Sequence, residues 1–388
     1  MTATADPVLA QRAQSLAQGA IGEALLPVEH ALAGTAPWEL AQAALATVLR
    51  NPLESGDQAA LYVGAPAAAF VLHLAAADTD RFQRALRTLD TAVTDLTHRR
   101  LDAAHARINS RQRPRPAEYD LLHGLTGLGV YLARRDPDSE TLHRVLRYLV
   151  RLTEPLNTRG ETLPGWWVSL GPTHNPDPVF AHSGHGNLGM AHGITGPLAF
   201  LARCYRHGIH VPGQTEAIER ICDWLDSVRQ DSATGPWWPK WITLSEQRDH
   251  AVTQPGPGRP SWCYGTPGIA FAQQLAGVAL GDPARQAMAE GALLLCLADT
   301  AQLAEITDAG LCHGAAGLLR TIHRAAQDAR YPPAFTAHLP ALVDLLHTRQ
   351  PPGRTGLLDG TTGLALTLHA EQTSGSPSCD WDACLLLT

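Results

Sequence analysis

A short glycine motif recurs along this chain and limits the folds that it can adopt. Two glycines separated by two residues precede a small or apolar stretch in five places, and a sixth copy has alanine at the second glycine position. A motif that returns at intervals along a chain indicates a repeat architecture. The copies are HGLTGLGVYL from His123, HGITGPLAFL from His192, YGTPGIAFA from Tyr264, HGAAGLLRTI from His313, DGTTGLALTL from Asp359 and YVGAPAAAFVL from Tyr62.

The segments around these motifs have helical periodicity. Residues Glu216 to Gln230 place their apolar side chains on one face and most of their charges on others, which is typical of an outer amphipathic helix. The stretches Leu198 to Cys204 and Ile269 to Ala276 are apolar nearly all round, as helices buried inside a larger shell are. Each repeat is therefore predicted to contain one exposed and one buried helix.

The glycine turns suggest how the repeats are arranged. A tight entry into a helix needs a positive φ or a close backbone approach, both of which glycine permits. If every inner helix starts at its Gly-x-x-Gly turn, all inner helices run in the same direction and their positive dipole ends meet at one rim. We therefore expect an all-α protein, an α/α toroid formed by a single domain over residues 1–388, in which this rim favours anionic or thiolate chemistry.

Composition excludes several classes of protein. The chain has 388 residues, 45% hydrophobic and 17% charged, which suffices for a large core. A net charge of -7 and a pI near 6.2 argue against a nucleic-acid partner. Met1 to Ala10 lacks a secretory signal pattern, and no apolar run is long enough for a transmembrane segment. Seven cysteines, an odd number, favour a reducing compartment, so we expect a cytoplasmic protein.

Three residues form the sharpest candidate for a metal site. Cys312 and His313 directly precede one Gly-x-x-Gly turn, and Cys263 lies two residues before the previous turn. Equivalent positions on neighbouring repeats should meet at the same rim. Two thiolates and one imidazole form a zinc set with a free fourth position, which is typical of catalytic sites. The other cysteines are interpreted as small buried side chains: Cys204, Cys222, Cys296, Cys379 and Cys384.

Further titratable residues occupy matching places. His192 and His123 each precede the first glycine of a motif, so position alone does not decide which of them transfers a proton. Asp120 lies one helical turn before Gly124, where a carboxylate can orient an imidazole. Arg259, in a proline-rich loop, is a candidate to stabilise an oxyanion. On pattern alone, a solvated loop charge or a capping residue is the better explanation for each of them.

Two other patterns are weaker. The run GHGNLG from Gly184 matches a dinucleotide fingerprint, but no apolar strand and no βαβ unit accompany it, so we discount a nucleotide site. The aromatic stretches Trp166 to Leu170 and Trp237 to Thr243 suit short hairpins or loops. Their tryptophans either line a peptide groove or anchor the packing, and packing is the commoner role.

Several motifs together resemble one known family. NLGMAHGITGP, RPSWCYGTPGIA and LCHGAAG occur in this order, and AEYDLLHGLTGLG, GPWWPKWIT and WDACLLLT extend the likeness over nearly the whole chain. The set resembles the lanthionine synthetase C-like family, and within it the stand-alone cyclases of class I lanthipeptide pathways.

The resemblance implies an α/α barrel with one zinc ion per chain, held by Cys263, Cys312 and His313. It also implies functional roles for His192, Asp120 and Arg259. Cyclases of this family can carry a small inserted domain, for which residues 78–118 are the expected place here, as a short and largely helical insertion.

The implied reaction is closure of thioether rings in a dehydrated precursor peptide, whose core and leader are both expected to contact the protein. A peptide cysteine thiolate adds to dehydroalanine or dehydrobutyrine, and His192, held by Asp120, protonates the resulting enolate; His123 or a metal-bound water is the alternative acid. A dehydratase and an exporter are candidate partners, through which the protein would lie at the membrane periphery. Glutathione addition to dehydroamino acids and a non-catalytic scaffold for a peptide-modifying complex remain alternatives.

Overall fold

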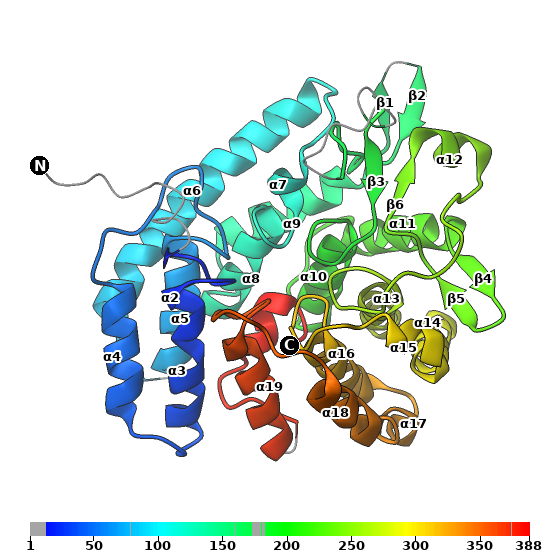
Figure 1. Cartoon of the computed structure of the whole chain (residues 1–388). Helices are drawn as coiled ribbons and strands as arrows, with labels where there is room; N and C mark the ends of the chain where they lie inside the picture. Colours follow the sequence, from blue (N-terminus) through cyan, green and yellow to red (C-terminus); the bar gives the residue numbers. More distant parts are fainter. Residues whose placement is uncertain (1–12, 78, 159, 173–179, 181–182, 374) are drawn as a thin grey trace, which may run out of the picture.

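The helices predicted at the glycine motifs form the inner wall of a closed ring. The computed structural model describes residues 13–77, 79–158, 160–172, 180, 183–373 and 375–388. The segment Met1 to Ala10, which was searched for a secretory signal, lies outside the described residues. Each inner helix contacts the next one around the ring (Figure 1). The inner helices that follow the six predicted motifs are α5 (Ala65–Ala76), α8 (Leu125–Arg135), α10 (Thr195–Arg206), α13 (Thr266–Leu280), α16 (Ala315–Asp328) and α19 (Thr361–Gln372).

A second layer of amphipathic helices surrounds this wall. Helix α11 buries Ile218, Ile221 and Leu225 completely and turns its charged residues outward, as the periodicity predicted. The outer helices are α4 (Trp38–Val48), α6 (Gln83–Asn109), α9 (Glu140–Leu152), α11 (Gln214–Ser227), α14 (Pro283–Ala298) and α18 (Leu339–Thr348). Two concentric helical layers make the protein an α/α toroid, which confirms the predicted fold class.

A further copy of the motif closes the ring. Gly19 precedes the short helix α2 (Ala20–Glu23), Gly22 lies within it, and helix α3 (Leu25–Leu32) follows. Helix α3 contacts α5 on one side and α19 on the other. A Cβ atom on Gly22 would lie 2.0 Å from the Leu16 carbonyl oxygen, a clash that recurs at the second glycine of other copies. The described residues therefore contain seven inner segments, one more than the sequence analysis identified.

The loops that enter the inner helices are joined by main-chain hydrogen bonds. Each loop bonds to the loop of the neighbouring repeat, so the helix N-termini meet at one rim, as predicted. The N–H groups of Leu121, Met190, Cys263, Leu311, Leu357 and Leu16 donate to the carbonyls of Ala191, Cys263, Cys312, Leu358, Ala17 and Tyr62, respectively.

In the copies that have it, the second glycine allows the loop to fold back onto its helix. A Cβ atom on Gly317 would lie 1.8 Å from the Leu311 carbonyl oxygen, closer than any real contact. By contrast, Gly265 is a first glycine and has a φ of 94°, which side chains rarely adopt. Close approach is thus the constraint at Gly317, and backbone conformation is the constraint at Gly265.

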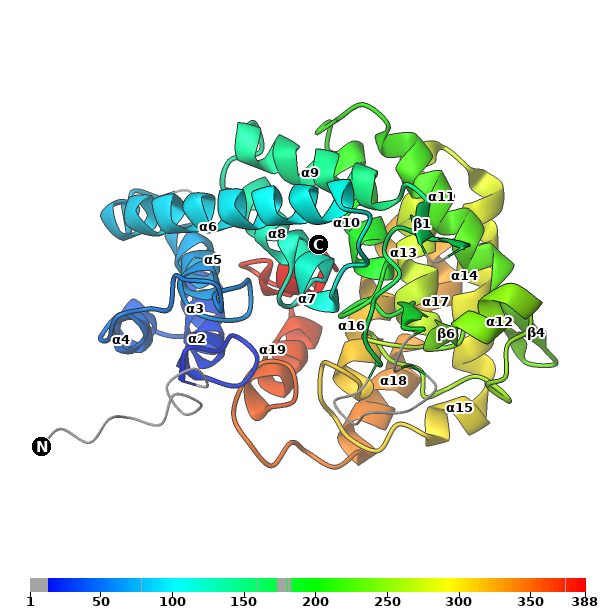
Figure 2. The same cartoon turned by 90° about the horizontal axis from the view of Figure 1, so that it is seen from above.

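The axis of the toroid is filled by residues 381–388, which include the 3-10 helix η1 (Trp381–Leu385) (Figures 1 and 2). Asp382 is fully buried and accepts hydrogen bonds from Arg320 and Arg324 of α16. The indole N–H of Trp262, in the loop before α13, donates to the Leu385 carbonyl at 2.9 Å. This plug, residues 381–388, therefore connects the inner helices to the loops at the rim.

Strands are few in the described part of the chain, and all are short. Three antiparallel pairs form, one of which joins β3 in the GHGNLG run to β6 in the predicted aromatic hairpin region. Four of the five tryptophans that were considered for a groove are at most 6% exposed, namely Trp166, Trp167, Trp237 and Trp238, so they anchor the packing. The strands are β1 (Leu156–Thr158) with β2 (Glu161–Leu163), β3 (His185–Asn187) with β6 (Trp241–Thr243), and β4 (Gln230–Ser232) with β5 (Gly235–Trp237).

The region proposed for an inserted domain, residues 78–118, is mostly helix. Asp78 itself lies outside the described residues. Helix α6 runs across the outside of the ring against α5, α8 and α9 (Figure 2) and is followed by α7 (Pro116–Tyr119). The remaining short helices are α12 (Leu244–Asp249), α15 (Thr300–Ala304) and α17 (Pro332–Thr336), and no described helix has the length and apolarity needed to cross a bilayer.

Candidate metal centre

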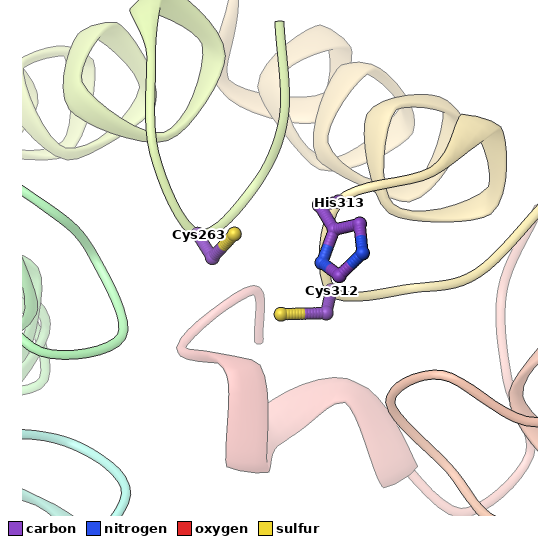
Figure 3. A group of neighbouring side chains, drawn as sticks. All are labelled: Cys263, Cys312 and His313. Atoms are coloured by element: carbon purple, nitrogen blue, oxygen red, sulfur yellow. The ribbon is translucent and has the colours of Figure 1, made fainter. Parts of the chain in front are cut away.

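Cys263, Cys312 and His313 come together at the rim from two neighbouring loops. Cys263 precedes α13, whereas Cys312 and His313 precede α16, and the three side chains point toward one another (Figure 3). One possible ligand atom from each lies within 4.8 Å of the others. The main-chain N–H of Cys263 donates to the Cys312 carbonyl at 3.2 Å, which fixes the spacing between the two loops. The structure therefore brings the three predicted ligands together.

The two sulfurs have opposite protonation preferences. The pKa of Cys263 is lowered well below its usual range, chiefly because the Cys312 thiol donates to its sulfur; burial opposes this, and His313 adds to it. The pKa of Cys312 is raised because it holds its proton toward Cys263, and its partial burial acts in the same direction. The hydrogen bond to Cys263 also raises the pKa of His313. A thiolate at Cys263 is thus stabilised by two donors, as a metal cation would stabilise it.

This donor set suits zinc. Two sulfurs and one imidazole nitrogen are soft to borderline ligands, which select against magnesium and calcium. Among the described residues, no fourth Cys, His, Asp or Glu places a ligand atom within the same group. Three protein ligands leave one tetrahedral position for another molecule.

Two aspartates that the sequence analysis missed flank the imidazole of His313. Nε2 of His313 lies 3.8 Å from Asp308, and Nδ1 lies 3.7 Å from Asp359. Asp359 directly precedes Gly360 in the next motif, the same position that His313 has before Gly314. This equivalent position in the motif was the sequence signal that could have identified Asp359 as a site residue. A carboxylate at this distance attracts an N–H group of the imidazole and can therefore orient the ring.

A second group lies on the same rim and contains Asp120, His123 and His192. Nδ1 of His192 lies 2.7 Å from Oδ2 of Asp120, and Oδ1 of Asp120 accepts the main-chain N–H groups of His123 and Gly124. The two imidazoles stack with a centroid separation of 5.7 Å. Burial opposes ionisation of Asp120, but hydrogen bonds from both histidines hold its pKa below the usual value.

The environment of His192 favours its protonated form. Burial of the ring lowers its pKa, but the hydrogen bond and the charge of Asp120 outweigh this effect and raise the pKa overall. His123 is more open, with half of its side chain exposed and Nδ1 3.7 Å from Asp120. The shorter bond to Asp120 and the deeper position distinguish His192 from His123, which the sequence alone did not.

Tyr264 and Arg259 complete this part of the rim. The Tyr264 hydroxyl accepts a hydrogen bond from the Asn187 amide at 3.0 Å. Burial, with smaller contributions from the charges of Cys263 and Asp120, raises the pKa of Tyr264 to about 12, so its hydroxyl keeps its proton. Arg259 lies within electrostatic reach of Cys312 and His313, and its buried Nε atom has no hydrogen-bond partner in the described part of the chain. Tyr264 was not predicted, although it occupies the position that His192 has in its own motif.

Comparison with known proteins decides the family. A model of the family described as lanthionine synthetase C-like protein matches residues 11–386. This chain belongs to that family. The lanthionine synthetase C-like chain is 22% identical, over 262 residues, to the nisin biosynthesis protein NisC of Lactococcus lactis subsp. lactis. The aligned region covers 67% of this chain and 60% of the length of that relative.

The toroid of this lanthionine synthetase C-like protein also has a counterpart among solved structures. A nisin cyclase superposes with a TM-score of 0.81 at 20% identity, covering 97% of this chain and 92% of the other. At this level of identity the likeness concerns the fold alone.

Proposed function

We propose that this chain is a zinc-dependent lanthipeptide cyclase, which closes thioether rings in a dehydrated precursor peptide. The observation that carries the proposal is that two separate groups share one rim: Cys263, Cys312 and His313 on two loops, and Asp120 with His192 on two others. The first group fits a thiol-activating metal, and the second fits an acid. Family membership supports the same reaction class.

The metal-binding part of the proposal assigns Cys263, Cys312 and His313 as ligands of one zinc ion. When bound, zinc would lower the pKa of a peptide thiol so that the thiolate forms near neutral pH. The residues around the site hold its geometry: the bond between the Cys263 and Cys312 main chains fixes the loops, and Asp308 and Asp359 flank His313.

The second group supplies the proton that the addition requires. The peptide thiol first loses its proton to solvent. The sulfur then forms a bond to the β-carbon of a dehydroalanine or dehydrobutyrine, and the electron pair of the carbon–carbon double bond moves toward the carbonyl as an enolate. His192 donates its proton to the α-carbon, and solvent returns a proton to the imidazole. Since Asp120 raises the pKa of His192, the acid form is available near neutrality.

Arg259 has a charge-stabilising role in this proposal. Its guanidinium acts on Cys312 and His313 through space. A fixed cation beside a site where an enolate develops stabilises the transition state more than the neutral substrate. The same cation can hold a carbonyl of the peptide in place.

The substrate is proposed to be a peptide that a dehydratase has modified and an exporter then removes. A complex with these two proteins would place the chain in the cytoplasm, at the membrane periphery. Purification of the chain from cells that express both candidate partners, followed by mass spectrometry, tests this assembly.

The test of the proposed function uses a synthetic peptide with one cysteine and one dehydroalanine separated by three residues. Ring closure leaves the mass unchanged but protects the sulfur, so a cyclised peptide does not gain mass with iodoacetamide. We expect protection with the purified chain and zinc, and loss of protection in Cys312→Ala. Transfer of glutathione to the peptide, seen as a mass increase when glutathione is added, would instead support the alternative reaction. Full alkylation in both assays would contradict the proposal.

A further inference from the structure

Helix α6 and the loop after it carry an unusual charge for this chain. Residues 81–115 contain nine arginines, no lysine and three aspartates, whereas the whole chain has a net charge of -7. Part of this charge is neutralised, since Arg107 binds Glu118 through two hydrogen bonds of 3.1 and 2.6 Å. The remaining excess is a local positive field on an otherwise acidic protein, which attracts anionic groups.

A cavity of about 360 Å³ lies in this basic region and adjoins the candidate site. Its size is in the range of ligand pockets and accommodates one or two residues of an extended peptide. Small side chains leave the space open on the α6 side. The lining includes Arg100, Ala103 and Ala104 of α6, Arg115 and Ala117 around the start of α7, and His123.

His123 forms the wall between this cavity and the acid group. Its ring stacks on His192, which Asp120 holds, while half of its side chain is exposed. The main-chain carbonyl of His123 accepts a hydrogen bond from Arg100, whose other donors bind the carbonyls of Asp57 and Ala59. Arg100 therefore braces the wall, since both of its terminal nitrogens bind main-chain carbonyls.

Arg115 is the cation that remains available in the cavity. It is exposed, and no ion pair or side-chain hydrogen bond involves it among the described residues. The two acidic side chains of the lining have other surroundings: Glu118 is bound to Arg107, and the Asp57 carboxylate is 87% exposed and 3.9 Å from Arg99. A ligand with a negative charge would thus find one unpaired cation beside the small side chains of Ala103 and Ala117.

From this arrangement we infer that the cavity is a subsite for an acidic residue of the substrate peptide, next to the segment whose ring is being closed. The inference rests on the proposed function, because it assumes that the reacting peptide lies over His192. A peptide that extends from His192 past His123 would enter the cavity directly. Arg115 would then bind the acidic side chain, and Ala103 would provide the space for it.

Binding is tested without turnover. Two fluorescein-labelled peptides carry serine in place of the reactive cysteine and differ only in having three aspartates or three asparagines beside it. We expect the purified chain to bind the aspartate peptide about fivefold more tightly at low ionic strength, measured by fluorescence anisotropy. Salt should reduce the preference, since the interacting charges are exposed. Equal affinities for the two peptides at low salt would overturn the inference.

Charge variants at one position assign the preference. Arg115→Glu should abolish or reverse the preference, whereas Arg115→Lys should retain most of it because the positive charge remains. A preference that survives Arg115→Glu would contradict the assignment.

A matched pair of variants then tests the cavity itself. Ala103→Trp fills it from an exposed position on α6, and Thr88→Trp fills another cavity, about 670 Å³, on the same helix but away from His123. We expect Ala103→Trp to weaken binding of both peptides about fivefold or more and Thr88→Trp to leave it unchanged. Equal effects of the two variants would overturn the inference. Failure of the proposed function is seen separately, as full alkylation of a reactive peptide.

Discussion

The Nδ1 atom of His192 lies 2.7 Å from the buried carboxylate of Asp120, although 72 residues separate them in sequence. The two residues stand on the loops of neighbouring repeats, which are themselves joined by the bond from Leu121 to Ala191. With Nδ1 bound to Asp120, Nε2 is the atom of the ring that remains for transfer to a substrate. The geometry of the repeat thus creates an oriented acid from residues of two separate copies of the motif.

Replacing His192 by alanine should stop turnover without releasing the metal. Loss of a positioned acid costs about 10²- to 10⁴-fold in rate, while all three proposed zinc ligands remain. Alkylation kinetics with the synthetic peptide and zinc analysis of the same sample measure both effects. His123→Ala is the matched control and should slow the reaction far less. A His192→Ala variant that cyclises at the normal rate would move the acid role to His123 or to a metal-bound water.

The pH profile should depend on Asp120. The acid form of His192 is lost as the pH rises through its raised pKa, so the rate should fall there. In Asp120→Asn the carboxylate that raises this pKa is gone and burial, which lowers it, remains. The falling limb of kcat/KM against pH should therefore move to lower pH. If the falling limb does not move in Asp120→Asn, it does not report the protonation of His192.

Loss of one proposed ligand should remove the metal. We expect about one equivalent of zinc per chain in the wild type and less than about one tenth in Cys312→Ala, because two ligands seldom hold zinc against a buffer. Atomic absorption after desalting gives the content, and circular dichroism checks the fold. Cys296→Ala provides the control, since Cys296 is buried in α14 away from the site. Equal zinc in both variants would refute the ligand assignment.

Two glycine-to-alanine substitutions should act in opposite directions. In Gly317→Ala the new Cβ would meet the Leu311 carbonyl at 1.8 Å, so the loop must move, and we expect a loss of about 2–3 kcal/mol in the free energy of unfolding. In Gly291→Ala, within α14, nothing lies within 4 Å of the new atom. Helix propensity predicts a gain of about 0.5–1 kcal/mol there. Urea denaturation compares the two, and a neutral Gly317→Ala would contradict the close-approach argument.

The buried charge of the central plug should matter more than its exposed neighbour. Asp382 is fully buried between Arg320 and Arg324, and these arginines hold its pKa well below the usual value against the effect of burial. Asp382→Asn leaves two buried cations short of a partner and should cost about 3–5 kcal/mol. Asp380→Asn, at a carboxylate 42% exposed, should cost less than about 1 kcal/mol. Similar urea midpoints for the two variants would argue against the plug as a stabilising element.

The sequence predicted those features that repeat. The glycine pairs and the apolar stretches after them located six inner helices. Cys263, Cys312 and His313 were identified as neighbours because each lies just before such a glycine turn. The first repeat escaped notice because Gln18 replaces the usual His, Tyr or Asp before Gly19, and because its inner segment is divided between α2 and α3.

Features that depend on contacts between distant segments were not predictable. The segment WDACLLLT does not predict that Asp382 contacts Arg320 and Arg324 in the middle of the ring, since no periodicity encodes that contact. The choice between His123 and His192 likewise depends on which imidazole lies closer to Asp120. That difference depends on how the loops of two neighbouring repeats pack together, which a linear motif does not record.

The contact of α3 with α19 means that no repeat has an uncovered flank. In an open array of helical pairs, the outermost units need polar capping surfaces and extra units can be added at either end. Here the ring is closed, so adding or deleting one pair of helices would have to change the packing between all neighbouring repeats. Variation among such proteins should therefore accumulate in the connecting segments and outer helices, while the number of inner segments stays constant.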